Sequence, residues 1–235
     1  MAVQFSFWQT VAGVDVWRSN DGMAIAYEVR HASIDADGAP NAYAPDGAGL
    51  DLNANAGWPS GDWKNVLVAD PNDPGRPYIQ PEGGASPGFF VAMTSLRNPD
   101  KNIPDTSTEK YVDATRIPYF VYTSEFYNVK GTGGNGDFAF VWSATGTGSA
   151  AVMADVGGND LGEISVHLAE KLSGSTANPR NGAGVPELPL RFVVFPRSRT
   201  RLVWPLTDEA IQATGKELLD GIGGSEALAG YWGKR

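Results

Sequence analysis

Glycine and proline are the feature of this sequence that most restricts its fold. The chain has 29 glycines and 16 prolines among 235 residues, about one residue in five where average usage is roughly one in eight. Both residues interrupt regular structure and mark turns, so their density predicts short elements joined by tight turns and argues against a helical bundle. The length fits one all-β domain, and we treat residues 1–235 as a single domain.

Apolar and β-branched runs between these turns predict the strands. The strongest runs cover residues 117–123, 137–143, 150–156 and 190–195, and residues 145–148 form a predicted hairpin turn between two of them. Further short strands are predicted at residues 14–17, 23–27 and 89–94.

Two segments have the pattern of helices. Residues 165–172 have Ser165 as a possible N-cap and Gly174 near the C-terminal end, and residues 208–219 have the best helical periodicity. Many short strands with a few short helices predict a mainly β fold, with a β-barrel-like core that carries long loops.

The charge and cysteine content exclude several classes of function. The chain has 18 Lys and Arg against 27 Asp and Glu, a net charge of −9. An acidic protein of this kind lacks the basic face of a nucleic-acid binder. The negative charge accords with a cationic substrate, although charge alone is explained more simply by solubility. The absence of cysteine excludes disulfides, thiol catalysis and zinc–thiolate sites.

The sequence also carries no membrane signal. No apolar run approaches the roughly 20 residues of a spanning helix, and the N-terminal residues lack the basic and apolar regions of a secretory signal. We expect a soluble monomer with no nucleic-acid or membrane partner. If it acts outside the cell or in the periplasm, it leaves by a route that needs no signal peptide.

Familiar nucleophile and phosphate motifs are missing. The glycine-rich residues 131–136 are not followed by the Lys and Ser/Thr of a phosphate-binding loop, and we interpret them as a flexible loop. The two histidines, His31 and His167, lie far apart in sequence, and no Gly-x-Ser-x-Gly elbow is present. Carboxylates are therefore the remaining source of acid–base chemistry.

Asp155 and Glu163 are the best pair of such carboxylates. Asp155 ends an apolar strand, where burial penalises its charge, and Glu163 follows eight residues later, after a glycine-containing turn. The doubling back of the chain would let both reach one cleft, as the two carboxyls of a glycosidase must. The alternative is structural: an Asp that ends a strand at a turn and a Glu that suits a helix N-terminus.

A second acidic cluster lies at Asp35 and Asp37. With Gly38 they are similar to the start of a calcium loop, but no Glu stands at the twelfth position. Calcium, a cationic or hydroxyl-rich substrate and an ordinary Asp-Gly turn all remain open, and composition favours the turn. We predict no metal and no cofactor.

Taken together, these segments resemble the chitosanases of glycoside hydrolase family 75 over roughly residues 20 to 215. The order and spacing of the segments carry the resemblance. They are residues 34–43, 49–51, 55–57, 94–96, 111–113, 117–119, 136–139, 154–157, 162–165, 178–180 and 193–196.

The resemblance implies endo-hydrolysis of chitosan, the β-1,4 glucosamine polymer, with inversion at the anomeric carbon. It also implies a double-psi β-barrel core and maps the family's essential Asp and Glu onto Asp155 and Glu163. We assign Glu163 as general acid and Asp155 as general base, and expect Asp35 and Asp37 to contact substrate ammonium groups. Where the family commonly has Pro after Asp-Val-Gly, this chain has Gly158.

Two other functions remain open. The chain could hydrolyse the glycan strands of peptidoglycan, as an antibacterial effector exported without a signal, or it could be a carbohydrate-binding module that has lost catalysis. Trp58 and Trp63, in the loop-rich acidic region, are the predicted stacking platforms for sugar rings, although core packing explains most tryptophans more simply.

Overall fold

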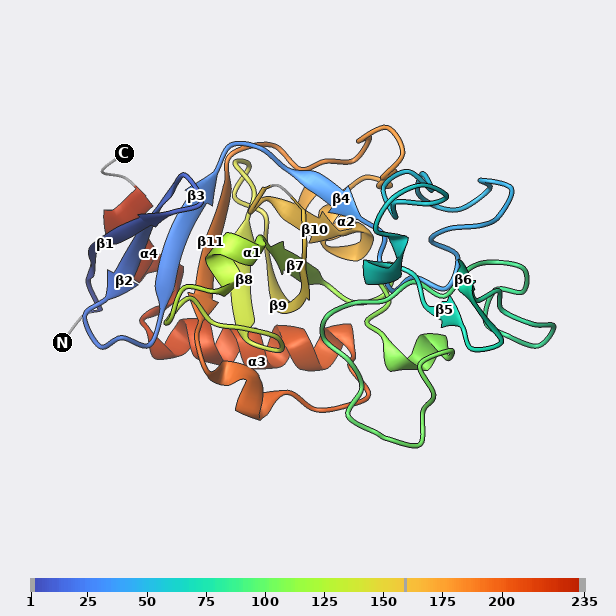
Figure 1. Cartoon of the computed structure of the whole chain (residues 1–235). Coiled ribbons are helices and arrows are strands. Elements are labelled where there is room, and N and C mark those ends of the chain that lie inside the picture. Colours follow the sequence, from blue (N-terminus) through green and yellow to red (C-terminus); the bar gives the residue numbers. More distant parts are fainter. Residues whose placement is uncertain (1–2, 159, 233–235) are drawn as a thin grey trace.

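The computed structural model describes residues 3–158 and 160–232 and shows a mainly β protein built on one mixed sheet (Figure 1). The nine strands of this sheet lie in the order β1 (Phe5–Val11), β2 (Val14–Ser19), β3 (Ile25–Val29), β11 (Leu190–Phe195), β8 (Phe138–Trp142), β9 (Gly148–Val156), β7 (Tyr119–Tyr122), β10 (Glu163–Ser165) and β4 (Ser33–Asp35). A second, two-stranded sheet consists of β5 (Ala69–Asp70) and β6 (Asp73–Pro77).

Helices are few and short. The α-helices are α1 (Ser124–Tyr127), α2 (Val166–Ser173), α3 (Asp208–Gly221) and α4 (Gly224–Trp232), and the 3₁₀ turns are η1 (Trp63–Asn65), η2 (Thr108–Lys110) and η3 (Ser198–Arg201). Within the described ranges, no helix is long and apolar enough to cross a membrane.

Strand pairing in the large sheet is antiparallel except for β7 with β9 and β4 with β10. The pairing order runs from β1 at one edge to β4 at the other. The predicted mainly β fold is therefore confirmed, whereas the described strands form an open sheet and no closed barrel is found among them. Helices and loops cover both faces of the sheet, so its apolar side chains are buried without closure.

The central strand β9 shows how both faces are buried. Ala150, Val152 and Ala154 belong to one apolar cluster, which the helix α3 joins, and Ala151 and Met153 belong to the other, which α2 joins. Because side chains alternate across a strand, a strand covered on both faces is apolar at every position.

Both predicted helices are confirmed, with caps that explain their ends. The Ser165 hydroxyl accepts a hydrogen bond from the Leu168 amide, and Gly174 ends α2 in the left-handed conformation. Thr207 caps α3 in the same way. The axis of α3 lies close to β9, because a Cβ added to Gly215 would lie only 2.3 Å from the Cβ of Ala150.

The main departures from the sequence prediction lie at the two ends of the molecule. At one end, the hairpin of β1 and β2 packs with α4, and β1 was not predicted (Figure 1). At the other end, residues 36–118 form long loops with only short elements, and residues 89–94 make isolated bridges instead of a strand. These loops lie beside β4, and together they form the site described next.

Candidate active site

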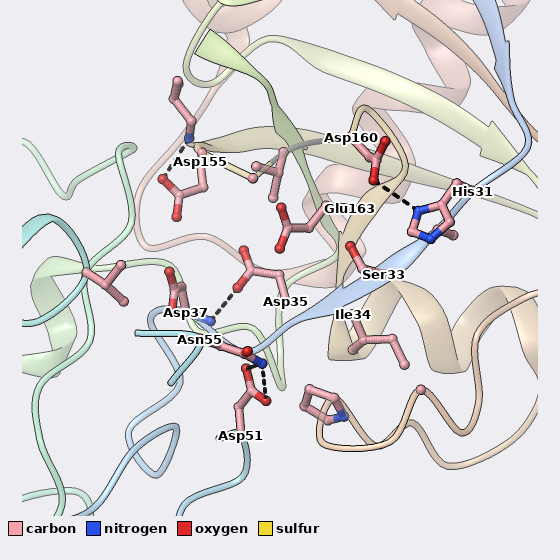
Figure 2. Close-up of a pocket in the computed structure, with 18 of the residues that line it drawn as sticks. His31, Ser33, Ile34, Asp35, Asp37, Asp51, Asn55, Asp155, Asp160 and Glu163 are labelled. Carbon is pink, nitrogen blue, oxygen red and sulfur yellow. Dashed lines mark hydrogen bonds and ion pairs between the residues drawn. The ribbon is translucent and has the colours of Figure 1, made fainter. Parts of the chain in front are cut away.

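A cavity of about 910 Å³ lies where β4, β10 and the end of β9 meet the long loops (Figure 2). Among the described residues that line it, none is lysine or arginine, and His31 is the only histidine. Six carboxyl groups line it, those of Asp35, Asp37, Asp51, Asp155, Asp160 and Glu163. Since no lysine or arginine lies among these acids in the described lining, the groups that are ionised would attract cations.

Strand pairing brings Asp35 and Glu163 together. β4 and β10 run parallel, with Glu163 opposite Ser33 and Ser165 opposite Asp35. Alternate residues of a strand point to the same face, and so do residues directly opposite each other on paired strands. Ser33, Asp35 and Glu163 therefore lie on one face of the sheet. Figure 2 shows the carboxyl groups of Asp35 and Glu163 extending into the same space.

A bulge in β9 brings Asp155 to this cavity. The register with β7 moves from Phe120 opposite Met153 to Val121 opposite Asp155, so Ala154 has no partner of its own in that pair. A bulge of this kind turns the following side chain away from the regular alternation. Asp155 thus leaves an otherwise buried strand with its carboxyl group in the cavity (Figure 2).

Two glycines allow the chain to approach Glu163 closely. A Cβ on Gly162 would lie 1.8 Å from the His31 carbonyl oxygen, and one on Gly158 would lie 2.2 Å from Oε2 of Glu163. Gly158 also has a φ of +63°, which proline cannot adopt because its ring fixes φ near −65°. The glycine at position 158 therefore permits a backbone turn packed directly against the Glu163 carboxyl group.

Asp155 is held by donors on one oxygen. Its Oδ1 accepts hydrogen bonds from the Ser95 amide at 3.0 Å, the Ser95 hydroxyl at 2.6 Å and the Val156 amide at 2.7 Å. Burial raises the pKa of Asp155, and these hydrogen bonds, together with the nearby Arg97, oppose that rise. The environment therefore favours the ionised form of Asp155 more than burial alone would allow.

Glu163 has a different environment. Among the described residues, none is found that donates a hydrogen bond to its carboxyl group. Burial raises its pKa to about 7, and the negative charges of Asp155, Asp51 and Asp160 add to that rise. Two neighbouring carboxyls thus differ: one is held by donors, and the other takes up a proton near neutral pH.

Asp35 and Asp37 form the floor of the cavity. Asp35 Oδ1 accepts a hydrogen bond from the Asp37 amide at 2.8 Å, and Asp37 accepts one from the Tyr43 hydroxyl, also at 2.8 Å. Burial raises the pKa of both carboxyls well above the usual value. The negative charges of Glu163 and Asp155 add to the rise for Asp35, and those of Asp35, Asp155 and Glu163 add to it for Asp37. Both predicted binding residues therefore lie in the same cavity as Asp155 and Glu163.

Asp51 is a further acid of the cavity that the sequence did not single out. It is 3% exposed, and its carboxylate accepts two hydrogen bonds from the Asn55 side-chain amide, at 2.9 and 3.0 Å. Its position after Gly49 and Leu50, in one of the segments that carry the family resemblance, is the signal that could have identified it. Tyr43, which donates to Asp37, was also missed, because loop residues give no periodic pattern.

Three of these acids are close enough together to share one ligand. Oxygens of Asp35, Asp37 and Asp155 lie within 4.8 Å of one another. Carboxylate oxygens at this spacing could hold a divalent cation, and they also suit a substrate ammonium group. That the protein needs no metal stays a prediction.

The two predicted tryptophans do not belong to this cavity. Trp63 is 6% exposed and packs in the core edge-to-face with Trp58, their ring centroids 5.6 Å apart, and Trp58 also contacts Phe90. Neither side chain lines the cavity. The long loops have few backbone ladders of their own, and these two aromatic side chains pack within them. Sugar stacking at Trp58 and Trp63 stays a prediction, which the burial of Trp63 does not favour.

The histidines have structural partners. His31 Nδ1 lies 3.2 Å from Asp160 Oδ2 at the rim of the cavity (Figure 2), and His167 Nε2 lies 3.1 Å from Asp208 Oδ2, where it ties α2 to α3. His31 lines the cavity but is paired with Asp160, and His167 does not line it.

A scan against models of known protein families finds no match, and a search of curated proteins finds none.

Proposed function

We propose that the protein is an inverting, endo-acting glycoside hydrolase that cleaves β-1,4 bonds of chitosan or a related amino-sugar polymer. The observation that carries the proposal is the pairing of Asp155 and Glu163 in one acidic cavity, one carboxyl held by hydrogen-bond donors and the other with a pKa of about 7. Two carboxyls in different environments are the apparatus of glycoside hydrolysis.

The environments favour one assignment of roles. Glu163, protonated below about pH 7, gives its proton to the glycosidic oxygen as the bond from the anomeric carbon to that oxygen breaks. Asp155 takes a proton from water, and the water oxygen bonds to the anomeric carbon from the opposite face. The two protons balance: one leaves Glu163, one arrives at Asp155, and exchange with solvent restores both groups.

The other acids supply substrate recognition. Asp35, Asp37 and Asp51 surround the same space, and no lysine or arginine lines it among the described residues. A polymer of glucosamine carries an ammonium group on each sugar, and carboxylates bind such groups through charge-assisted hydrogen bonds. The acetylated polymer chitin lacks that charge, so the cavity favours the deacetylated form.

The test is release of reducing ends from chitosan, chitin and purified peptidoglycan. Glu163→Gln keeps the size of the side chain but cannot donate the proton, so we expect activity on chitosan to fall by about 10²–10⁴-fold. Glu82→Gln, at an exposed loop position outside the cavity, is the matched control and should keep full activity. Circular dichroism checks that both variants are folded.

Each alternative predicts a different result. Cleavage of peptidoglycan alone would replace the substrate with a glycan strand of the cell wall. Binding of chitosan with no cleavage of any polymer would make the protein a carbohydrate-binding module. Full activity of Glu163→Gln on chitosan would contradict the proposed mechanism.

The resemblance further implies a double-psi β-barrel core, which stays a prediction. Its support is the adjacency of two parallel pairs, β7 with β9 and β4 with β10, around the antiparallel contact of β7 and β10. Superposition on a solved member of the family would test it. Action outside the cell or in the periplasm is likewise proposed, and detection of the protein in culture supernatant would test that.

A further inference from the structure

Asp155 uses only one of its two carboxylate oxygens to contact the protein. Oδ1 accepts all three hydrogen bonds, two of them from Ser95, while no hydrogen bond to Oδ2 is found among the described residues. The Ser95 hydroxyl oxygen also accepts a hydrogen bond from the Val156 amide at 3.1 Å. One serine therefore fixes the orientation of the Asp155 carboxylate.

Ser95 is itself held rigidly. On one side, the Thr94 hydroxyl donates to the Leu96 carbonyl at 2.7 Å and accepts from the Val112 amide at 3.0 Å. On the other, the Leu96 amide donates to the Ala154 carbonyl at 2.8 Å. The loop around Ser95 is thus bonded both to the neighbouring loop and to β9, the strand that carries Asp155.

The charges around Asp155 explain why such a tether is needed. Asp35 from β4, Asp37 from the following loop and Glu163 from β10 share its cavity, and Arg97, two residues after Ser95, is a cation that lowers its pKa. Carboxylates in one cavity repel each other, so an untethered Asp155 would turn away from its neighbours. The donors on Oδ1 oppose this movement.

We propose that Ser95 is a positioning residue for Asp155, which holds Oδ1 so that Oδ2 is the oxygen that accepts the proton from the attacking water. This proposal rests on the proposed function. It goes further because it names the reacting oxygen and a residue that does not touch the substrate. A general base must lie within hydrogen-bond reach of the proton it removes, and a fixed carboxylate keeps that geometry.

The test compares Ser95→Ala with Ser95→Thr. Loss of the hydroxyl should lower kcat about 10- to 100-fold, as expected for a lost hydrogen bond to a charged group, while KM stays within about twofold because Asp35, Asp37 and Asp51 still bind the sugar. Thr keeps the hydroxyl and should restore most of kcat. The acidic limb of the pH profile of kcat/KM should also move to higher pH in Ser95→Ala, since a hydrogen bond that favours the ionised base has been removed.

A matched control lies outside the cavity. Thr115 donates its amide and hydroxyl to Oδ1 of Asp113 at 2.9 and 2.7 Å, the same arrangement as Ser95 and Asp155, yet neither residue lines the cavity. Thr115→Val should leave kcat, KM and the pH profile unchanged. An equal loss of kcat in Thr115→Val and Ser95→Ala would show a general structural effect and overturn the proposal.

A second variant and a second measurement keep the test decisive. If Ser95→Ala does not fold, Ser95→Cys replaces it, because cysteine has a similar size and is a weaker hydrogen-bond donor. Ser95→Cys should lower kcat, whereas Ser95→Thr should keep most of it. Unchanged kcat in Ser95→Cys would overturn the proposal. If the wild-type protein cleaves no glycan, the proposed function fails on its own. The orientation of Asp155 in crystals of wild type and Ser95→Ala then judges the tether: one position in both proteins would overturn it, and a second position only in Ser95→Ala would support it.

Discussion

Two regions of the molecule bury carboxylates in opposite ways. Asp137, at the start of β8, is fully buried and accepts hydrogen bonds from the amides of Gly134, Arg197 and Arg199 at 2.8–3.0 Å, with the Arg199 guanidinium 3.9 Å away. In the cavity, buried carboxyls face one another instead, and no lysine or arginine lines it among the described residues.

This difference separates a structural acid from a functional one. Asp137 joins its own loop to the segment of Arg197 and Arg199, and burial of its charge costs little because the protein supplies the hydrogen bonds. The acids of the cavity have no lysine or arginine with them in its described lining, and burial and repulsion oppose ionisation of Asp35, Asp37 and Glu163, which a cationic ligand would favour. Perturbed carboxyls of that kind cluster at functional sites because folding alone would not favour them.

The largest effect is a loss of stability, which we expect when the structural acid Asp137 is replaced. Asp137→Asn replaces an oxygen that accepts amide hydrogens with an amino group that cannot, leaving buried donors unpaired, and should lower the free energy of unfolding by about 3 kcal/mol. Urea unfolding followed by circular dichroism measures it. Asp46→Asn is the control, since Asp46 is exposed and accepts only the Ala48 amide. Equal stability of the two variants would contradict this account of Asp137.

The next effect concerns the dependence of stability on pH. Glu163 has a pKa of about 7 in the folded protein against 4.5 as a free side chain. Between these values the folded state binds the proton more tightly, so stability falls as pH rises from about 4.5 to about 7, by up to about 3 kcal/mol from this group. Below that window both states are protonated, and above it the full penalty is present.

Glu163→Gln should flatten that part of the stability curve. The variant has no proton to lose, so its free energy of unfolding at pH 7.5 should exceed that of the wild type, with little difference at pH 4. Thermal unfolding from pH 4 to 8 measures both curves. Parallel curves would show that Glu163 titrates normally in the folded protein.

The smallest effect on stability is expected for Asp35, an acid of the cavity. Asp35→Asn keeps the shape and removes a carboxyl whose ionisation burial, Glu163 and Asp155 oppose, so it should raise the free energy of unfolding by about 1 kcal/mol at pH 7. It should also raise KM for chitosan, because a carboxylate that faces the ammonium group is lost. A variant that is less stable than the wild type, with unchanged KM, would make Asp35 a structural residue like Asp137.

The sequence predicted regular elements better than it predicted the site. Residues 190–195 form a strand with the predicted bounds, and both predicted helices are present, because local periodicity and capping residues determine such elements. β4 and β10, which carry Asp35 and Glu163, have three residues each. Segments so short have no detectable period, and only their pairing with each other makes them strands.

The same limit applies to the roles of individual side chains. Trp58 and Trp63 had the right residue type in an acidic loop region, but packing of the loops buries Trp63 and joins Trp58 to it. Asp137 and Asp155 both stand in segments that carry the family resemblance, yet one is neutralised by amides and the other faces a cavity. Residue type and spacing do not reveal which donors will surround a carboxylate.

A turn-rich, mainly β chain with an excess of acids and two carboxylates separated by a glycine-containing turn follows from composition and from neighbours along the chain. Which acids share a cavity depends on contacts between residues far apart in the sequence. Asp35, Asp155 and Glu163 are brought together by three features: the bulge in β9, the parallel pairing of β4 and β10, and the close approach that Gly158 and Gly162 permit. Burial of both carboxyls, the hydrogen bonds from Ser95 to Asp155 and the negative charges around Glu163 exist only once those long-range contacts have formed.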